Sequence, residues 1–406
     1  MNKANSPKIP RWARVNTLRT TLADTLAAPQ FAGFTAVSTI AELFLDAKKI
    51  YYIDPYVPNL LAFPPSTDLT SSQLYLGGQL ILQDRSSCLP ACLLNPPAGT
   101  WSVDATAAPG NKTTHLAALL EKPSAAAVIA FEKDPRRAEV LKKMVTRAGG
   151  DACIAIRAGE DFLKADPRSK PLKRVTHLLL DPSCSGSGIV SREEYELIPL
   201  TAPEPPGGKK RKRPVKVEKP KPVAIPAEID PEAEETPMEL AANRLASLAE
   251  FQRGMVLHAM SFPNARKITY STCSVHAEEN EDVVMAVLAS KVARRRGWRV
   301  ERRDEGTLAA WERRGLVEKC DGDSVIAEAC IRCNPIEDGG IGFFAVAFVR
   351  DGTVDIAADD EEEVADEAGE DDDAEEWGGF DDEEELEQVA PPPAKKQQKQ
   401  QQKNTK

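Results

Sequence analysis

The chain has 406 residues, of which 42% are hydrophobic and 28% are charged, a composition typical of a folded protein with polar additions. No apolar run reaches the roughly eighteen residues of a transmembrane helix, and the first residues lack the apolar centre of a secretory signal. The sequence thus argues against a transmembrane helix and against a secretory signal. We therefore expect the eight cysteines to be free thiols in a reducing compartment.

The net charge of −11 is divided unevenly along the chain. From Asp351 onward there are 21 acidic residues and 5 lysines, a net charge of −16, so residues 1–350 carry a net charge of +5. A mildly basic body is compatible with binding a polyanion. The tail 351–406 consists of acidic runs and then proline, lysine and glutamine. Such a segment cannot bury enough apolar surface to fold, and we predict that it is disordered.

Residues 1–75 open with a basic segment that contains an aromatic residue, since Arg11, Trp12 and Arg14 stand close together. Helix-like and strand-like pieces follow, and prolines interrupt them. We predict a small accessory domain over these residues.

From Leu76 onward, apolar strand-like segments alternate with helical ones, the pattern of βαβ units on a parallel sheet. The segments 324–333 and 340–350 predict an antiparallel hairpin at the edge of the sheet. We therefore expect one α/β domain over residues 76–350, with a mostly parallel, Rossmann-like sheet. Strands are predicted at 101–106, 126–132, 153–158, 176–181 and 267–273, and helices at 114–122, 134–149, 193–199 and 244–262.

The alternation stops between 201 and 238, where a basic, proline-rich stretch is followed by an acidic one. We predict a disordered insertion within the domain, because the strand pattern resumes afterwards. Its run Lys209–Arg213 has the composition of a nuclear import signal or an RNA-contacting arm, and a solvated charge run fits it equally well.

A loop rich in small residues, VDATAAPGNKTTH at 103–115, lies between a predicted strand and a predicted helix. Ala107, Ala108 and Gly110 let the backbone approach a ligand closely, and Pro109 fixes a turn. The unpaired N–H groups at the start of the following helix favour a carboxylate. The loop lacks the GxGxxG pattern, so an ordinary tight turn is an equal alternative at this point.

Three acidic residues, Glu132, Asp161 and Asp181, stand at or just after the ends of successive predicted strands. Ligands of open α/β sheets bind at the carboxyl ends of the strands, where an acid can hold a ribose hydroxyl pair. Each acid alone fits a helix cap or a solvated loop, but together they outline one crevice.

Cys184 and Cys273 also stand at the ends of separate predicted strands, in DPSCSGSG and TYSTCSVHAEEN. A buried cysteine is usually an inert core residue, but the glycine, serine and proline around these two indicate exposed turns. We expect both thiols to converge on the crevice. Cys330 and Cys333 have CxxC spacing, but no second such pair completes a zinc site, so we predict core thiols and no metal.

With these motifs in this order, the sequence resembles the Nop/Sun-type RNA cytosine-C5 methyltransferases over most of residues 10–350. That family's DxCAAPGxKT loop is matched by residues 104–113, and its two cysteine motifs are matched at 181–184 and 272–273. The segments LGGQLILQDRSSCLPA and GIGFF also match. RVNTLR, QDRSSCLPA and DPSCSGSG look most like the branch that modifies large-subunit 25S/28S rRNA.

The resemblance implies a class I methyltransferase fold that uses S-adenosyl-L-methionine, preceded by a small RNA-binding subdomain. It makes Cys273 the nucleophile that adds to carbon 6 of cytosine, Cys184 the residue that assists release of the 5-methylcytosine product, and Asp181 a support for the base. The resemblance also implies the cofactor contacts. Glu132 would bind the ribose, Asp161 would lie near the adenine, Asp181 would lie beside the methyl group, and Arg137 would line the same site. The methionine end would be held by Thr106, Ala107, Ala108, Pro109, Gly110, Asn111 and Lys112.

Two departures from the family pattern bear on these expectations. Thr106 stands where the loop usually has cysteine, and because the loop contributes chiefly backbone contacts, we expect cofactor binding to survive. The region before RVNTLR is shorter than in the rRNA branch, so we expect the subdomain at 1–75 to be truncated. Two alternatives stay open: the same chemistry on tRNA or another RNA, and a non-catalytic ribosome-assembly factor that keeps the fold.

The resemblance to the rRNA branch also implies a role in rRNA processing and ribosome biogenesis. We expect the partner to be rRNA in a pre-ribosomal particle, with no membrane association. The protein is expected to work as a monomer in the nucleolus, within the nucleus.

Overall fold

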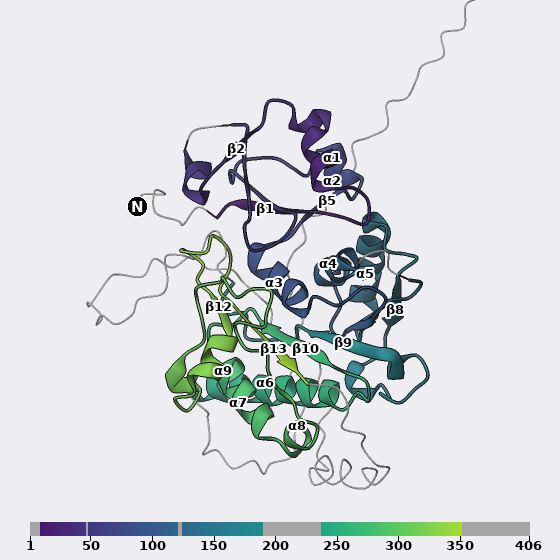
Figure 1. The fold of residues 1–406 in the computed structure, drawn as a ribbon, viewed down its shortest axis with the longest axis vertical. Coiled ribbons are helices and arrows are strands. Elements are labelled where there is room, and N and C mark those ends of the chain that lie inside the picture. The colour runs from purple at the N-terminus through teal and green to yellow at the C-terminus, as the bar shows by residue number, and fades with distance from the viewer. Residues whose placement is uncertain (1–8, 46–47, 121–123, 190–236, 351–406) are drawn as a thin grey trace, which may run out of the picture. The chain divides into compact units, whose positions relative to one another are not determined.

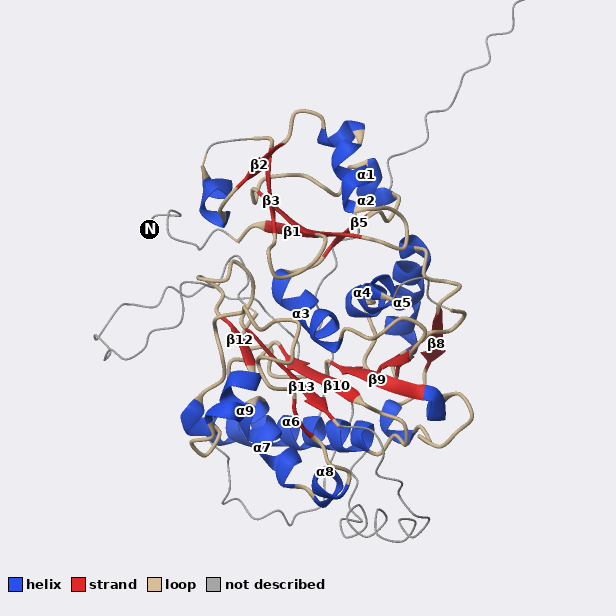
Figure 2. Cartoon of the chain, viewed as in Figure 1, coloured by secondary structure: helices blue, strands red, loops and turns tan. Residues whose placement is uncertain are grey.

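The computed structural model describes residues 9–45, 48–120, 124–189 and 237–350. The predicted helix at 193–199, the tail 351–406 and all but the last two residues of the insertion 201–238 lie outside them. The described residues form two sheets with helices around them (Figures 1 and 2). Among the helices of this part of the chain, none is long and apolar enough to cross a bilayer.

The N-terminal residues fold into a five-stranded sheet. The strands of this sheet are β1 Arg11–Val15, β2 Thr35–Val37, β3 Ile50–Ile53, β4 Leu60–Phe63 and β5 Leu80–Leu82, and the helices of this part of the chain are α1 Leu22–Ala27 and α2 Gln73–Leu76. The strand order is β2-β3-β4-β1-β5, and β1 pairs with β4 and β5 in antiparallel fashion. The sheet extends past the expected domain boundary at residue 75, because β5 completes it by pairing with β1.

The second sheet contains eight strands. They are β6 Trp101–Asp104, β7 Val128–Glu132, β8 Ile154–Ala158, β9 Val175–Leu180, β10 Lys267–Thr272, β11 Arg299–Val300, β12 Ile331–Cys333 and β13 Phe343–Val349. The order is β11-β13-β10-β9-β6-β7-β8, with β12 paired to β13. The five strands from β6 to β10 are parallel, as predicted. Since parallel strands end at one edge, the loops that follow them meet there.

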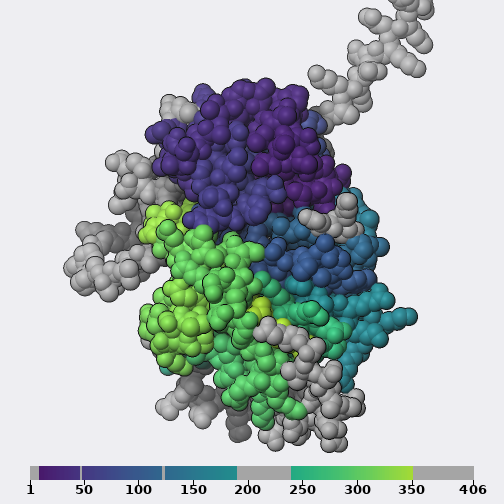
Figure 3. Space-filling model, viewed as in Figure 1, coloured from purple at the N-terminus to yellow at the C-terminus, as the bar shows by residue number. Residues whose placement is uncertain are grey.

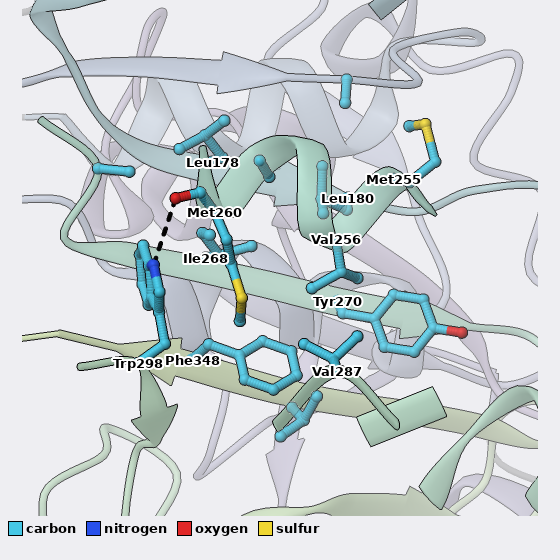
Figure 4. Close-up of a cluster of buried hydrophobic side chains, with 14 of the residues drawn as sticks. Leu178, Leu180, Met255, Val256, Met260, Ile268, Tyr270, Val287, Trp298 and Phe348 are labelled. Carbon is cyan, nitrogen blue, oxygen red and sulfur yellow. Dashed lines mark hydrogen bonds between the residues drawn. The ribbon is translucent and has the colours of Figure 1, made fainter. Parts of the chain in front are cut away.

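Apolar side chains on alternate faces of the parallel strands build two cores. Leu178 and Leu180 of β9 lie in a cluster with the helix α6 (Pro237–Met260). Leu179 between them lies in a cluster with the helices α3 (Arg85–Leu94), α4 (Asn111–Leu119) and α5 (Pro135–Ala148). Figure 4 shows the first cluster, where the Trp298 indole donates a hydrogen bond to the Met260 carbonyl at 3.3 Å. The helices around this sheet are α3 Arg85–Leu94, α4 Asn111–Leu119, α5 Pro135–Ala148, α6 Pro237–Met260, α7 Glu281–Ala289, α8 Lys291–Arg295 and α9 Ser324–Ala329.

The predicted hairpin of 324–333 and 340–350 is wrong in two respects. Residues Ser324–Ala329 form the helix α9, because the Asp323 side chain accepts hydrogen bonds from the N–H groups of Val325 and Ile326 and so caps a helix. Within 324–333, only β12 is a strand, and it pairs with β13 in antiparallel fashion as predicted. β13 itself lies inside the sheet, between β10 and β11, rather than at its edge.

Arg85, the first residue of α3, links the two sheets. Its guanidinium lies 5.5 Å from the ring centroid of Trp12, 5.2 Å from that of Tyr56 and 4.8 Å from that of Trp311. It also forms an ion pair of 2.7 Å with the buried carboxylate of Asp54. Residues of both parts of the chain enclose this charge and also share one apolar cluster, so each part completes the other's core. Figure 3 shows the N-terminal residues, in purple, in contact with the rest of the described chain.

We predict that Arg85→Ala lowers the free energy of unfolding by about 3–5 kcal/mol, because it leaves the Asp54 carboxylate buried without its cation. Urea denaturation of the purified protein measures the loss. Arg302→Ala is the matched control: its ion pairs with Asp304 and Glu305 are exposed, and it should cost at most about 1 kcal/mol. Equal losses in the two variants would contradict the proposed linking role of Arg85.

Candidate active site

Two thiols lie side by side at the edge where the parallel strands end. β9 and β10 are neighbours with Leu180 opposite Tyr270, so the loops that follow them start next to each other. The Sγ atoms of Cys184 and Cys273 are 3.1 Å apart, and both side chains are partly exposed. The structure thus brings together the two cysteines that the sequence singled out.

Each thiol changes the ionisation of the other. A hydrogen bond from Cys273 stabilises the Cys184 thiolate and lowers the pKa of Cys184. The same hydrogen bond, followed by burial and by the charges of Cys184 and Asp181, raises the pKa of Cys273. The two sulfurs can therefore share one proton across this contact, in which either sulfur can be the donor.

This coupling predicts opposite effects of removing either thiol. In Cys184→Ala the pKa of Cys273 falls, so Cys273 is alkylated faster by iodoacetamide at pH 8 than in the unmodified protein. In Cys273→Ala the pKa of Cys184 rises, so Cys184 is alkylated more slowly. Peptide mapping by mass spectrometry over a pH series measures both rates, with the buried Cys88 as an internal control. Unchanged pH profiles in both variants would refute the coupling.

The carboxylate of Asp181 lies between two partners. Lys112 Nζ forms an ion pair of 2.7 Å with its Oδ2, and Ser271 Oγ donates a hydrogen bond of 2.6 Å to its Oδ1. Burial lowers the pKa of Lys112, but the charge and the hydrogen bond of Asp181 outweigh this effect, and the pKa is raised. Lys112 was expected at the methionine end of the cofactor. The structure places its ammonium group on Asp181, beside the two thiols.

Thr106 ties the small-residue loop to Asp181. Its Oγ1 donates to the Asp181 carbonyl at 2.9 Å and accepts from the Asp181 N–H at 3.2 Å. A cysteine at this position would make weaker hydrogen bonds to the same groups, so the departure from the family pattern strengthens this contact. The start of the loop is held by Asp104, which accepts hydrogen bonds from Thr113 Oγ1 and the Thr106 N–H, and burial raises the pKa of Asp104 to about 6.

Close packing explains the glycine in this loop. Gly110 has a φ of +110°, and a β-carbon there would lie 3.0 Å from Cγ of Met144 and 3.1 Å from Cδ1 of Leu141. Any other residue would therefore be strained by the positive φ, and its β-carbon would force the Met144 and Leu141 side chains to shift. Ala107 lies next to β7, where its N–H donates to the Phe131 carbonyl at 2.8 Å.

Glu132 and Arg137 both contact Ala108 in the loop. The Glu132 carboxylate accepts a hydrogen bond of 3.2 Å from the Ala108 N–H, and Arg137 donates one of 3.2 Å to the Ala108 carbonyl. Asp161 lies after β8, where it accepts from the Leu163 N–H at 3.0 Å and forms an ion pair of 3.3 Å with Lys133. All the residues predicted for the cofactor thus lie at the carboxyl ends of the strands, on the loops that follow, or at the start of the next helices, and their roles stay predictions.

The sequence interpretation missed several polar residues that surround the thiols. Ser271 contacts Asp181, Glu279 contacts the loop of Cys184, and Asn280 contacts the loop of Cys273. Ser271, Glu279 and Asn280 all stand in or beside the second cysteine motif, TYSTCSVHAEEN, so their proximity in the sequence was the available signal. Successive side chains of β10 point to opposite faces of the sheet, so Ser271 lies on the face opposite to that of Tyr270.

Two family models match the chain. Residues 9–83 match the NOL1/NOP2/Sun domain family member 5 ferredoxin-like domain, and residues 91–197 match the 16S rRNA methyltransferase RsmB/F model. The chain is 32% identical over 351 residues to the 26S rRNA (cytosine-C(5))-methyltransferase nsun-5 of Caenorhabditis elegans, covering 84% of this chain and 68% of that protein. The chain belongs to the NOL1/NOP2/Sun domain family.

Other relatives in this family are similar to the chain over most of its length. The 25S rRNA (cytosine-C(5))-methyltransferase rcm1 of Schizosaccharomyces pombe is 39% identical over 84% of this chain and 63% of its own length. The 28S rRNA (cytosine-C(5))-methyltransferase of Mus musculus is 36% identical over 86% of this chain and 64% of its own length. The chain therefore spans a little under two thirds of these two relatives.

Solved structures show that the chain has the fold of the family. A methyltransferase homologue from Pyrococcus horikoshii aligns with a TM-score of 0.56 at 19% identity, over 84% of this chain and 87% of that one. NSun6 from the same organism, solved with SFG, aligns with a TM-score of 0.51 at 17% identity, over 86% of this chain and 92% of that one. The predicted class I methyltransferase fold with a small N-terminal subdomain is thereby confirmed.

Proposed function

We propose that this member of the NOL1/NOP2/Sun domain family methylates carbon 5 of a cytosine in large-subunit rRNA, with S-adenosyl-L-methionine as the methyl donor. The observation that carries the proposal is the pair of thiols 3.1 Å apart on the loops that follow β9 and β10, the first of which also carries Asp181. Carbon 5 of cytosine is a poor nucleophile until a thiolate adds to carbon 6, so the reaction needs a cysteine next to the methyl group.

The two cysteines act in different stages of the reaction, Cys273 in the attack on carbon 6 and Cys184 in the release of the product. Cys273 attacks carbon 6 as a thiolate, and its proton can pass to Cys184 across the 3.1 Å between the sulfurs. The C6–S bond forms while the ring electrons move to carbon 5, which takes the methyl group. Carbon 5 then loses its proton to a base, the C6–S bond breaks, and Cys273 recovers its electron pair. Cys184 assists this release, and Asp181 with Lys112 supports the base.

The donor set around the small-residue loop fits the cofactor. Asn111 Oδ1 is buried and has no hydrogen-bond partner among the described residues, so it is available to an amino group. The Glu132 carboxylate accepts two backbone hydrogen bonds and lies where a ribose would sit at the end of β7. When bound, S-adenosyl-L-methionine supplies an electrophilic methyl group. Thr106 to Lys112 would hold its methionine end, and Asp161 its adenine.

The names of the relatives support large-subunit rRNA as the substrate, because the proteins of S. pombe, mouse and C. elegans are named as 25S, 28S and 26S rRNA methyltransferases. We propose that the protein acts as a monomer on rRNA within a pre-ribosomal particle. A non-catalytic assembly factor would have no need of both thiols and Asp181, and their presence favours the enzyme. Methylation of tRNA or another RNA is the second candidate.

Bisulfite sequencing of total RNA, with and without the gene, tests the substrate. We expect one or more cytosines of large-subunit rRNA to lose methylation in cells without the gene. In these cells Cys273→Ala should not restore methylation, because nothing adds to carbon 6. Cys184→Ala should leave the protein covalently bound to RNA, seen as a slow band on a denaturing gel. Methylation restored by Cys273→Ala would overturn the assigned roles, and a loss confined to tRNA would favour the second candidate.

We further propose that the protein works in the nucleolus, since large-subunit rRNA is made and modified there. The basic run Lys209–Arg213 is a candidate import signal by its composition. Replacing these five residues by glutamine should move a fluorescently tagged full chain from the nucleolus toward the cytoplasm. The same replacement of Lys395, Lys396, Lys399, Lys403 and Lys406 is the charge-matched control. An unchanged distribution in the first variant would remove this run as the signal.

A further inference from the structure

Two adjacent residues, Glu279 and Asn280, contact the two cysteine loops separately. They lie where the 3-10 turn Ala277–Glu279 meets α7, and both are fully buried. In the described part of the chain, none of their side-chain hydrogen bonds goes to either sulfur atom. Their hydrogen bonds go instead to the residues that flank Cys184 and Cys273.

Glu279 holds the loop of Cys184. Its carboxylate accepts hydrogen bonds from Ser185 N at 2.8 Å and from Ser185 Oγ at 2.6 Å. Gln252 of α6 donates to the same carboxylate at 2.9 Å and also to the Ser183 carbonyl at 3.0 Å. The residues before and after Cys184 are thus both fixed to one buried group of hydrogen bonds.

Asn280 holds the strand end that carries Cys273. Its Oδ1 accepts a hydrogen bond of 2.6 Å from Thr272 Oγ1, and its Nδ2 donates one of 3.0 Å to the Ser274 carbonyl. The residues on both sides of Cys273 are therefore fixed by a single side chain. A buried amide with both of its functions used in this way leaves the backbone around Cys273 little freedom.

The two loops also contact each other directly. Gly188 N donates to the Cys273 carbonyl at 2.8 Å, and a β-carbon at Gly188 would lie 2.8 Å from that carbonyl and 2.3 Å from the Gly342 carbonyl. Ser185 Oγ is 3.1 Å from Ser274 Oγ. These contacts bring the loops together, while Glu279 and Asn280 fix each of them to the buried end of α7.

We propose that Glu279 and Asn280 are positioning residues that act on different steps of the reaction: Asn280 aligns Cys273 for attack on carbon 6, and Glu279 aligns Cys184 for release of the methylated base. The inference rests on the proposed function, because it assigns these side chains to the two thiols of that reaction. A small displacement of a reacting group lowers its rate steeply, so losing one anchor should slow one step and spare the other.

The test follows the covalent adduct in cells that lack the gene and express the full chain. RNA that contains 5-azacytidine retains the covalent protein–RNA adduct, because the nitrogen at position 5 has no proton to lose and the C6–S bond therefore cannot be broken. The amount of this adduct measures the attack step. The adduct on unmodified RNA reports slow release, and bisulfite sequencing reports complete turnover. Protein levels are matched by immunoblot, so a variant that folds less well lowers all three signals together.

Thr272→Val removes the hydroxyl that Asn280 holds while keeping the shape of the side chain. We expect the adduct on 5-azacytidine RNA to fall by about tenfold, a part of the roughly hundredfold loss that a misplacement of about 1 Å can cause, with no adduct on unmodified RNA. Thr269→Val is the matched control: the same change three residues earlier on β10, where the buried hydroxyl has no hydrogen-bond partner among the described residues. It should behave like the unmodified protein.

Glu279→Gln weakens the anchor of the Cys184 loop without changing its size. We expect the adduct on unmodified RNA to rise by about tenfold, while the adduct on 5-azacytidine RNA stays within about twofold of the unmodified protein. Ser185→Ala removes a hydroxyl that Glu279 binds and should shift the signals in the same direction. Glu301→Gln, at a largely buried carboxylate that pairs with Lys267 at the other end of β10, is the control and should change neither signal.

The outcomes separate this inference from the proposed function. If the unmodified protein leaves rRNA unmethylated and Cys184→Ala forms no adduct, the proposed function fails. If both behave as expected but Thr272→Val and Glu279→Gln lower attack and release alike, the two residues merely stabilise the fold and the inference is overturned. It is likewise overturned if either variant matches its control.

Discussion

The parallel pairing of β9 with β10 is the constraint on which the site depends. Because Leu180 lies opposite Tyr270, the next residues of both strands leave the sheet at the same edge, and two cysteines 89 residues apart come within 3.1 Å. Apolar side chains on both faces bury this pairing, since β9 contributes Leu178 and Leu180 to one core and Leu179 to the other. A shift of register by one residue would exchange these faces and separate the thiols.

Around this edge, the polar side chains beside the two cysteine loops pair with one another. Asp181 is neutralised by Lys112 and receives a hydrogen bond from Ser271. The Glu279 carboxylate lies deeper and receives hydrogen bonds from Ser185 and Gln252. Buried networks of this kind are costly when one partner is missing and rigid when all are present. The site can therefore hold two loops in place while leaving the sulfur atoms partly exposed to a substrate.

The N-terminal sheet is coupled to the site through α3. Arg85, at the start of this helix, lies among the rings of Trp12, Tyr56 and Trp311 and pairs with Asp54. Asp84 caps the same helix, and its neighbour Ser86 donates to the Ile341 carbonyl at 3.1 Å, just before β13. Phe343 of that strand lies under the Lys112 ammonium at 5.5 Å. Packed elements thus connect the expected RNA-binding subdomain to the residues that face the thiols.

The sequence by itself determined the class of fold, the five parallel strands and the two cysteine motifs, because these depend on local periodicity and on short runs of residues. It did not determine that Ser324–Ala329 is helical or that β13 lies inside the sheet, since a cap at Asp323 and strand pairing across the domain decide both. Nor did it place Lys112 on Asp181 or give a role to Glu279 and Asn280. Those contacts join residues on different elements, and only the tertiary packing brings their side chains within hydrogen-bond distance.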